Sequence, residues 1–197
     1  MQARQAAKPS LAGLILAGGQ SSRMGQDKAL VKWQGVPLLE RVCQVAAICC
    51  DRLYILTPWP DRYRPILTEH PTFLTETVPG QGPLIAFSQG LAQVHQDWVL
   101  LLGCDLPCLD PTVIQTWAGQ LTDLPDSVMA YVPRTDYWQP LCGFYRRTAQ
   151  PQLQAFIESG GRSFQTWLSQ INAEAIAVEA ATAPMLRNCN RPADLTD

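Results

Sequence analysis

The most informative stretch of this sequence is Leu14-Ile-Leu-Ala-Gly-Gly-Gln-Ser-Ser-Arg-Met-Gly-Gln-Asp-Lys28. An apolar run, typical of a buried strand, leads directly into a glycine pair, and Arg23 and Lys28 follow on the same loop. Glycine leaves backbone N–H groups open to close approach by phosphate oxygens. Arginine binds phosphate through two parallel hydrogen bonds, and lysine supplies a compact positive charge. The stretch therefore predicts a loop that holds a nucleoside triphosphate. The competing interpretation is a tight strand-to-loop turn with incidental basic residues.

Length and composition indicate one globular domain. The chain has 197 residues, of which 47% are hydrophobic and 16% charged, so a sizeable core is feasible. We expect residues 1–10 to form a disordered tail and residues 11–197 a single domain. The net charge of −2 argues against a general nucleic-acid binder. No apolar run reaches the length of a membrane span. Seven cysteines without a C-x-x-C pair favour the cytoplasm.

Apolar segments of strand and helix character alternate through the first two thirds of the chain. This order predicts an α/β fold with three layers (α/β/α) and a mainly parallel, Rossmann-like sheet. Strands are expected at 11–17, 53–56, 98–102, 128–132 and 141–145, with a short one before Asn188. Helices are expected at 38–50, 84–94, 149–159, 163–170 and 192–196, and a further helix begins after Asp110, which is an N-cap candidate.

A second motif follows the strand expected at 98–102. The segment Gly103-Cys-Asp-Leu-Pro107 places Asp105 just past the end of that strand. The Gly18-Gly19 pair also follows a strand, so both should lie at one edge of a parallel sheet, where ligands of such sheets bind. Mg²⁺ typically binds one or two carboxylates together with substrate phosphates. Asp105 is therefore a candidate magnesium ligand, and the alternative is an aspartate that merely caps a turn.

The chain resembles a known family over nearly its whole length. The pattern Leu16-Ala-Gly-Gly-x-Ser-x-Arg-Met-Gly-x-Asp-Lys28 is similar to the N-terminal signature of the molybdenum cofactor guanylyltransferases, within the glycosyltransferase-A-like nucleotidylyltransferases. The Cys-Asp-Leu-Pro segment resembles the metal-binding segment of that family. The resemblance implies two groups of residues. The catalytic group is Arg23, Lys28 and Asp105, with Asp105 on the metal, and the nucleotide contacts include Leu16, Ala17, Gly18, Gly19, Lys28 and Asp105.

Further segments match the family beyond these two motifs. Gly80-Gln-Gly-Pro-Leu84, which contains Gly82, resembles a Gly-Pro-Leu segment beside the nucleotide, although Ile85-Ala86 replaces the usual Ala-Gly. Glu76 falls near an acidic position linked to nucleotide recognition, if a gap of one residue is accepted. Its alternative is a solvated loop glutamate. Thr57 occupies a position where related chains place a polar nucleotide contact.

Three segments are similar to the part of the family that faces molybdopterin. They are Tyr137-Trp-Gln-Pro-Leu141, Gly160-Gly-Arg-Ser163 and Asn188-x-Asn190-Arg-Pro192. The resemblance implies that Arg162 binds the terminal phosphate of molybdopterin. Asn188 and Asn190 would complete the metal shell or orient the acceptor phosphate. An exposed arginine and ordinary turn asparagines are the competing interpretations.

The expected activity is Mg²⁺-dependent transfer of GMP from GTP to molybdopterin, with release of pyrophosphate. A molybdopterin cytidylyltransferase or a sugar-phosphate nucleotidylyltransferase is the nearest alternative. A non-catalytic nucleotide-binding adaptor for molybdoenzyme maturation is a more distant one. GTP and molybdopterin are the expected small-molecule partners, and molybdenum-insertion proteins and molybdoenzyme chaperones are the expected protein partners. Neither nucleic acid nor a membrane is expected.

Overall fold

Strands with unbroken apolar runs form the centre of the molecule. The computed structural model describes residues 8–18 and 27–189. Strand β1 (Leu11–Leu16) pairs in parallel with β4 (Arg52–Thr57) on one side and with β6 (Trp98–Gly103) on the other. All six residues of β6 are buried, as are the first five of β1. A strand that is buried on both faces needs an apolar run without alternation, and both sequences provide it.

The described residues form a seven-stranded sheet with the order β5-β4-β1-β6-β8-β7-β9. The four strands of this sheet not yet introduced are β5 (Thr72–Thr75), β8 (Cys142–Arg146), β7 (Ala130–Arg134) and β9 (Ala173–Ala177). Among the described strands of this sheet, β8 alone runs antiparallel to its neighbours. The expectation of a mainly parallel α/β sheet is confirmed.

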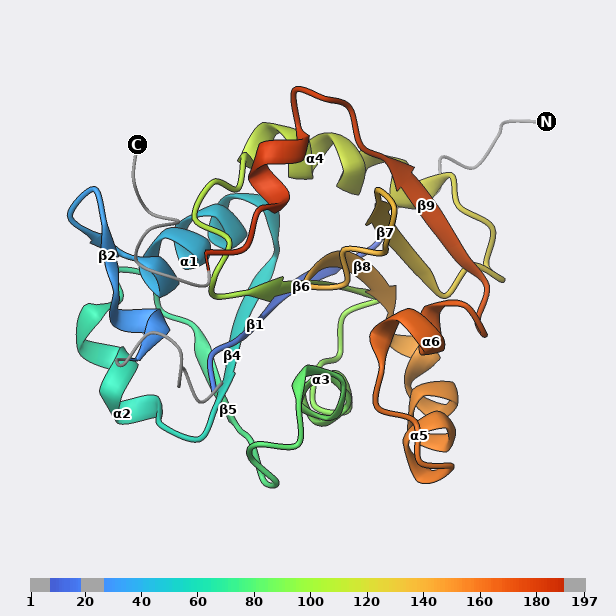
Figure 1. Ribbon diagram of the computed structural model, residues 1–197, viewed down its shortest axis with the longest axis horizontal. Coiled ribbons are helices and arrows are strands. Elements are labelled where there is room, and N and C mark those ends of the chain that lie inside the picture. Colours follow the sequence, from blue (N-terminus) through green and yellow to red (C-terminus); the bar gives the residue numbers. More distant parts are fainter. Residues whose placement is uncertain (1–7, 19–26, 190–197) are drawn as a thin grey trace.

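Helices cover both faces of the sheet (Figure 1). Helices α1 (Leu38–Cys49) and α4 (Pro111–Gly119) pack on one face, and α3 (Pro83–Leu91), α5 (Gln150–Glu158) and α6 (Phe164–Leu168) on the other. Successive side chains of β1 point to opposite faces, so Ile15 joins the core beneath α1 while Leu14 joins the core beside α3. The predicted three-layer arrangement is confirmed.

Four aromatic rings join the second helical layer to the antiparallel part of the sheet. Phe87 of α3 and Tyr145 of β8 lie with ring centroids 4.7 Å apart. Trp167 of α6 stacks on Tyr145 at 5.8 Å, and Phe164 contacts all three rings. Such offset and tilted pairs stabilise a core beyond the burial of their area. The cluster therefore fixes β8 and the loop that precedes it.

Two helix starts follow the capping signals of the sequence. Asp110 accepts a hydrogen bond from the Thr112 N–H at 2.8 Å, and Pro111 occupies the first position of α4. The Ser163 hydroxyl caps α6 in the same manner, accepting from the Thr166 N–H at 3.4 Å. A polar contact also ties the segment before β1, since Ser10 donates its N–H and hydroxyl to Asp97.

Several short elements differ from the sequence-based expectations. The structure contains a hairpin of β2 (Lys32–Trp33) and β3 (Val36–Pro37), the short helix α2 (Pro60–Tyr63) and edge strand β5, none of which was predicted. The hairpin turns through Gln34 and Gly35, both with positive φ. Elements of two to four residues are too short to show a period.

The C-terminal part of the chain also differs. The 3₁₀ helix η5 (Ala183–Leu186) lies before Asn188, and the strand expected there is β9, more than ten residues upstream. The helix expected at 192–196 lies outside the described residues. The remaining 3₁₀ turns are η1 (Lys28–Leu30), η2 (Arg64–Ile66), η3 (Gln120–Thr122) and η4 (Arg147–Ala149). None of the helices in the described ranges combines the length and apolar character needed to cross a membrane.

A buried carboxylate attaches the connection between α2 and β5 to helix α1. The Glu40 side chain is only 3% exposed. It accepts hydrogen bonds from the backbone N–H of Thr68 at 3.2 Å, from the Thr68 hydroxyl and from Gln44 Nε2 at 2.8 Å. Because β5 borders the candidate site described below, this contact also supports the site's outer wall.

We predict that Glu40→Ala destabilises the fold by about 1–3 kcal/mol, because both Thr68 donors and Gln44 lose their buried acceptor. Urea denaturation followed by circular dichroism measures the effect. Glu158→Ala is a matched control, since Glu158 also accepts a hydrogen bond from a glutamine one helical turn away, Gln154, but is exposed. Equal changes in the two variants would contradict the anchoring role of Glu40.

Candidate active site

The carboxyl ends of four parallel strands meet at one edge of the sheet. In the order β5-β4-β1-β6, the residues at or just past the strand ends are Glu76, Thr57, Gly18 and Asp105 respectively. Backbone pairing continues just past the strands, since Ala17 N–H donates to Leu56 O at 3.0 Å and Glu76 N–H to Thr57 O at 3.4 Å. Residues that are far apart in the sequence are therefore placed side by side, at the edge where parallel sheets bind ligands.

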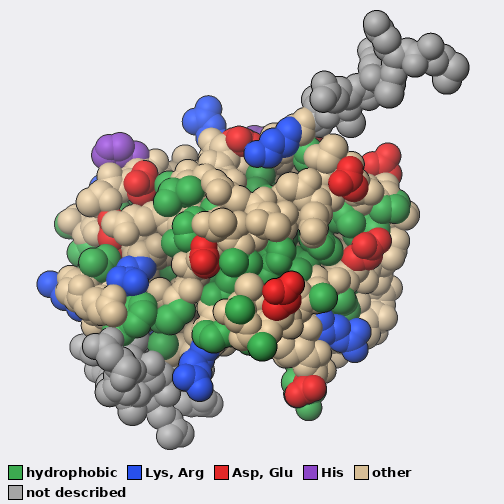
Figure 2. Space-filling view, turned by 90° about the horizontal axis from the view of Figure 1, so that it is seen from above, with side chains coloured by type: hydrophobic (Ala, Val, Ile, Leu, Met, Phe, Trp, Pro, Cys, Tyr) green, Lys and Arg blue, Asp and Glu red, His purple; other side chains and the backbone are tan. Residues whose placement is uncertain are grey.

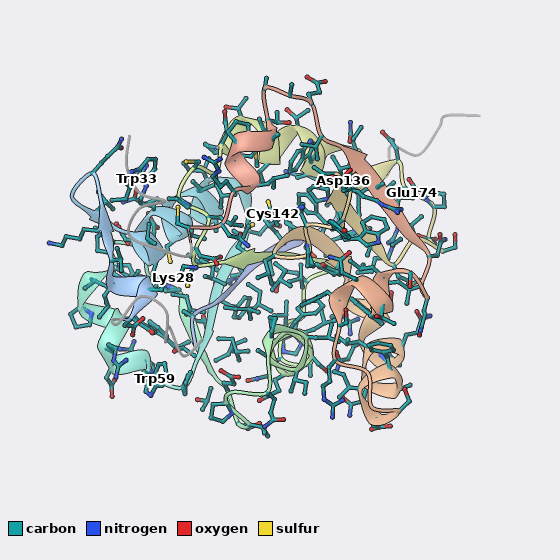
Figure 3. All side chains as sticks on the ribbon, viewed as in Figure 1. Lys28, Trp33, Trp59, Asp136, Cys142 and Glu174 are labelled. Atoms are coloured by element: carbon teal, nitrogen blue, oxygen red, sulfur yellow. The ribbon has the colours of Figure 1, made fainter. Side chains whose placement is uncertain are left out.

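An ion pair between Lys28 and Asp105 forms the charged centre of this edge. Lys28 Nζ lies 2.8 Å from Asp105 Oδ2, and the two side chains are 13% and 17% exposed. Figure 3 shows Lys28 beside the end of β6. The second carboxylate oxygen, Oδ1, is buried and has no hydrogen-bond partner in the described protein. Buried carboxylate oxygens normally have partners, so Oδ1 is a candidate ligand atom.

The backbone around Asp105 is built to hold this carboxylate close. A Cβ atom on Gly103 would lie 2.6 Å from Asp105 Oδ1, so only glycine leaves room for the carboxylate there. Gly103 N–H donates to Leu141 O at 2.9 Å, and Asp105 O accepts from Cys189 N–H at 2.9 Å. The loop is thus fixed by β8 on one side and by the C-terminal segment on the other.

The donor set suits magnesium bound together with phosphates. No group of three or more His, Cys, Asp or Glu side chains that could hold a metal occurs within residues 8–18 and 27–189. A protein site with one carboxylate is typical of Mg²⁺, which keeps waters and takes further oxygens from substrate phosphates. Asp105 Oδ1 could supply the carboxylate oxygen that such a site needs, and Lys28 lies beside it as a positive charge.

Asp27 fixes the residue that precedes Lys28. Its Oδ1 accepts from the Ala29 N–H at 3.1 Å and caps η1, which begins at Lys28. Its Oδ2 accepts from the Tyr63 hydroxyl at 2.8 Å and from Arg62 Nη1 at 2.9 Å. Burial, and next the bond to Asp27, raise the pKa of Tyr63 well above its ordinary value. Sequence reasoning gave Asp27 no role, because its partners lie 35 and 36 residues away.

Glu76 is packed directly against the glycine of the first loop. Its carboxylate is 7% exposed, and a Cβ on Gly18 would lie 2.6 Å from its Oε2. Burial raises the pKa of Glu76, and a hydrogen bond from the Gly80 backbone opposes that shift. Glu76 is therefore a buried group at the site edge, and the solvated loop glutamate considered above is wrong. The role of Glu76 in nucleotide recognition stays a prediction.

Thr57 and Gly82 occupy two different settings at this edge. Thr57 is fully buried, and its hydroxyl accepts from the Trp59 N–H at 3.1 Å. It therefore holds the start of the loop that leads to α2. Gly82 is exposed and precedes α3 with φ of 90°, a conformation that favours glycine. Neither geometry by itself assigns a nucleotide contact, so both stay predictions.

A pocket of about 290 Å³ opens beside the Asp105 loop. It is lined by Leu106, Tyr137, Trp138, Gln139, Pro140, Leu141, Cys142, Leu186 and Asn188. Cys142, labelled in Figure 3, is buried at the start of β8. The Gln165 amide fixes the wall, because its Oε1 accepts from Trp138 N–H at 3.0 Å and its Nε2 donates to Trp138 O at 2.8 Å. The pocket thus joins two of the three segments predicted to face the second substrate.

The third segment lies apart from the residues that line this pocket. The exposed Arg162 donates from Nη1 to Ile157 O at 2.9 Å and to Gly161 O at 2.7 Å. Its guanidinium therefore binds carbonyl oxygens at the end of α5, and its phosphate contact stays a prediction. Gly19, Arg23 and Asn190 lie outside the described residues. Leu16 and Ala17 are described: Leu16 ends β1, and Ala17 connects it to Gly18.

Comparison with known proteins identifies the family to which the chain belongs. A family model described as "MobA-like NTP transferase domain" matches residues 13–174, which include most of β1 and both motif loops. The chain belongs to this family. It is therefore a nucleotidyltransferase, and the parallel-strand edge that carries Lys28 and Asp105 is its candidate active site.

Individual relatives agree with this placement. A protein of Nostoc sp. named as a probable molybdenum cofactor guanylyltransferase is 52% identical over 187 residues, covering 94% of this chain and 89% of its own. A relative in Synechococcus elongatus with the same name is 43% identical over 94% of this chain and 96% of its own. The solved molybdopterin-guanine dinucleotide biosynthesis protein A of Archaeoglobus fulgidus has the same fold, with a TM-score of 0.77, 21% identity and coverage of 93% and 94%.

We predict that Gly103→Ala lowers nucleotidyl transfer about tenfold or more, because the added methyl group displaces the Asp105 carboxylate without removing it. Transfer kinetics, together with Mn²⁺ binding followed by electron paramagnetic resonance, measure the effect. Gly119→Ala is the matched control, since a Cβ there meets no atom within 4 Å. Unchanged metal binding and transfer in Gly103→Ala would contradict the proposed importance of the carboxylate position.

Proposed function

We propose that this protein transfers GMP from GTP to molybdopterin in a Mg²⁺-dependent reaction that releases pyrophosphate. The observation that carries the proposal is the difference between the surroundings of the two Asp105 carboxylate oxygens. One oxygen pairs with Lys28 and the other is buried without a partner. This arrangement lies at the sheet edge of a nucleotidyltransferase whose relatives are named molybdenum cofactor guanylyltransferases.

The reaction is an in-line substitution at the α-phosphorus of GTP. A terminal phosphate oxygen of molybdopterin forms the new P–O bond, while the bond from the α-phosphorus to the oxygen bridging to the β-phosphate breaks and pyrophosphate leaves. The acceptor phosphate is already ionised near neutral pH, so its attack requires no strong general base. The protein then contributes by positioning the reactants and by neutralising their charge.

Lys28 and Asp105 divide this electrostatic work. In the nucleotide-bound enzyme, Lys28 Nζ contacts triphosphate oxygens and balances the charge of the departing pyrophosphate. Asp105 would hold the magnesium ion through its unpartnered oxygen Oδ1. Bound there, Mg²⁺ neutralises charge on the phosphates and orients them. The family resemblance adds Arg23 as a second cation toward the triphosphate and the Gly18-Gly19 backbone as the cradle.

The pocket beside the Asp105 loop is the proposed site of molybdopterin. Its opening is bordered by the aromatic residues Tyr137 and Trp138, and Tyr137 is 71% exposed. Aromatic faces suit a flat, heteroaromatic ring system such as a pterin. Asn188 lies in the lining and offers an amide toward the acceptor phosphate. Leu106, adjacent to Asp105, belongs to the same lining, so the pocket is next to the proposed metal ligand.

Glu76 is the proposed determinant of guanine selection. A carboxylate accepts hydrogen bonds from both the N1–H and the 2-amino group of guanine, and adenine offers no such pair of donors. Glu76 is buried next to Gly18, where a nucleotide held by the first loop would place its base. Burial penalises the charged form of the Glu76 carboxylate, so hydrogen-bond donors from a base would stabilise it.

The deciding experiment follows pyrophosphate release from GTP, CTP and ATP with Mg²⁺, in the presence of molybdopterin, of a sugar phosphate or of no acceptor. We expect release that requires both GTP and molybdopterin. Release from CTP would instead identify a cytidylyltransferase, and release that requires a sugar phosphate would identify the sugar-phosphate alternative. Nucleotide binding with no release for any acceptor would support the adaptor hypothesis and contradict an enzyme.

The seven cysteines are all free thiols, which supports a cytoplasmic location.

We predict that Asp105→Ala remains folded and loses at least about 100-fold in transfer rate, because the metal ligand and the partner of Lys28 are removed together. Circular dichroism and single-turnover kinetics test this. Asp126→Ala removes an aspartate whose side chain is fully exposed, so it should keep normal transfer. Normal transfer in Asp105→Ala would overturn the metal assignment.

We predict that GTP affinity weakens as pH falls. The midpoint of this loss should lie at a higher pH than the midpoint that a glutamate with an ordinary pKa would produce. Burial raises the pKa of Glu76 above its usual 4.5, and only the ionised carboxylate accepts both guanine donors. Calorimetric titration of GTP over pH measures this effect. Glu76→Gln should flatten the dependence, while Glu174→Gln, at an exposed position on β9, should preserve it. An identical pH profile in Glu76→Gln would contradict the role of Glu76.

A further inference from the structure

Asp27 is held more firmly than a simple capping residue requires. Its two carboxylate oxygens accept three hydrogen bonds, from the Ala29 N–H, the Tyr63 hydroxyl and Arg62 Nη1. The cap alone would use one oxygen. The other oxygen connects the end of the first loop to helix α2, a separate part of the chain.

The anchor on α2 is itself fixed. Tyr63 is 1% exposed and packs in the core beneath α1, so its hydroxyl has little freedom. The Arg62 guanidinium lies over the Trp59 ring, with its central carbon 4.7 Å from the ring centroid. The backbone N–H of Trp59 in turn donates to the Thr57 hydroxyl at the end of β4. A chain of contacts therefore runs from the β4 end to Asp27.

Lys28 follows Asp27 immediately, and its ammonium group reaches Asp105 at 2.8 Å. The backbone of Lys28 begins η1, whose direction is set by the Asp27 cap. A lysine side chain is flexible and loses much rotamer freedom when it is fixed. A rigid starting point for the side chain reduces the range of positions that Nζ can occupy.

We propose that Asp27 is a positioning residue that fixes Lys28 for the triphosphate, acting through its bonds to Tyr63 and Arg62. This rests on the proposed function, because it assigns Lys28 the role of neutralising the triphosphate. Asp27 touches neither substrate nor metal in this account. It fixes the place from which Lys28 reaches toward Asp105 and the phosphates.

A double-mutant cycle tests whether Asp27 acts through Lys28. We expect Asp27→Ala to lower kcat/KM for GTP about 10- to 100-fold. In a Lys28→Met background, the same substitution should cost less than about twofold, because the group it positions is already absent. Tyr63→Phe keeps the ring and removes the hydroxyl, so it should lower kcat/KM in the same direction and with the same dependence on Lys28. Asp27→Asn keeps an oxygen for the Ala29 N–H and should recover part of the loss.

Tyr54→Phe is the matched control for Tyr63→Phe. The Tyr54 hydroxyl also donates to a side chain, Gln96 Oε1 at 3.4 Å, but Gln96 precedes β6 and lies at the opposite edge of the sheet. Wild-type kinetics are expected for this variant. Thermal melting of every variant separates loss of positioning from loss of folding, and Tyr63→Phe decides the matter if Asp27→Ala does not fold.

A second arm measures binding of inorganic tripolyphosphate with Mg²⁺ by calorimetry, which needs neither GTP nor molybdopterin. We expect Asp27→Ala to weaken tripolyphosphate binding when Lys28 is present. In the Lys28→Met background, the same substitution should leave the affinity unchanged. Failure of GTP transfer in the wild type would contradict the proposed function, while this arm would still decide the role of Asp27. Equal losses in the presence and absence of Lys28, or wild-type behaviour of Asp27→Ala and Tyr63→Phe, would overturn the inference.

Discussion

The pairing of Lys28 with one oxygen of Asp105 is the interaction on which the site depends. It brings a cation and an anion together in a largely buried place, where unpaired charges would be costly. It also divides the carboxylate, because Oδ1 is left buried without a partner in the described protein. A group that is satisfied on one side and unsatisfied on the other is suited to take a cation there. The pair is therefore compatible with the proposed ligand, which brings both phosphate and metal.

The fold makes this pair possible by placing two loops next to each other. Strands β1 and β6 pair in parallel from Leu11↔Trp98 to Leu16↔Gly103, so their carboxyl ends coincide. Gly103 lets the Asp105 carboxylate fold back against its own strand end, and Gly18 gives Glu76 the equivalent room. Figure 2 shows the molecule from above, with acidic and basic side chains interspersed around a central apolar area. The face seen in that view is therefore not dominated by charges of one sign.

Much of this arrangement could be predicted from the sequence, and the rest depends on contacts that leave no local pattern. The apolar runs at 11–17 and 98–102 predict buried parallel strands, and strand ends predict which loops meet. Asp110, followed by Pro111, shows its capping role locally. The attachment of Asp27 to Tyr63 depends on tertiary packing across 36 residues, so no spacing rule reveals it. The β2–β3 hairpin and β5 were missed because two to four residues carry no measurable period.

The central claim is that Asp105 offers Oδ1 to a metal while Lys28 serves the phosphates. A crystal structure with Mn²⁺ and a non-hydrolysable GTP analogue, phased on the anomalous signal of manganese, tests it most directly. We predict a manganese peak within about 2.0–2.3 Å of Asp105 Oδ1, with Lys28 Nζ in contact with a phosphate oxygen. A bound nucleotide whose metal lies away from Asp105, or with Lys28 turned away from the phosphates, would contradict it.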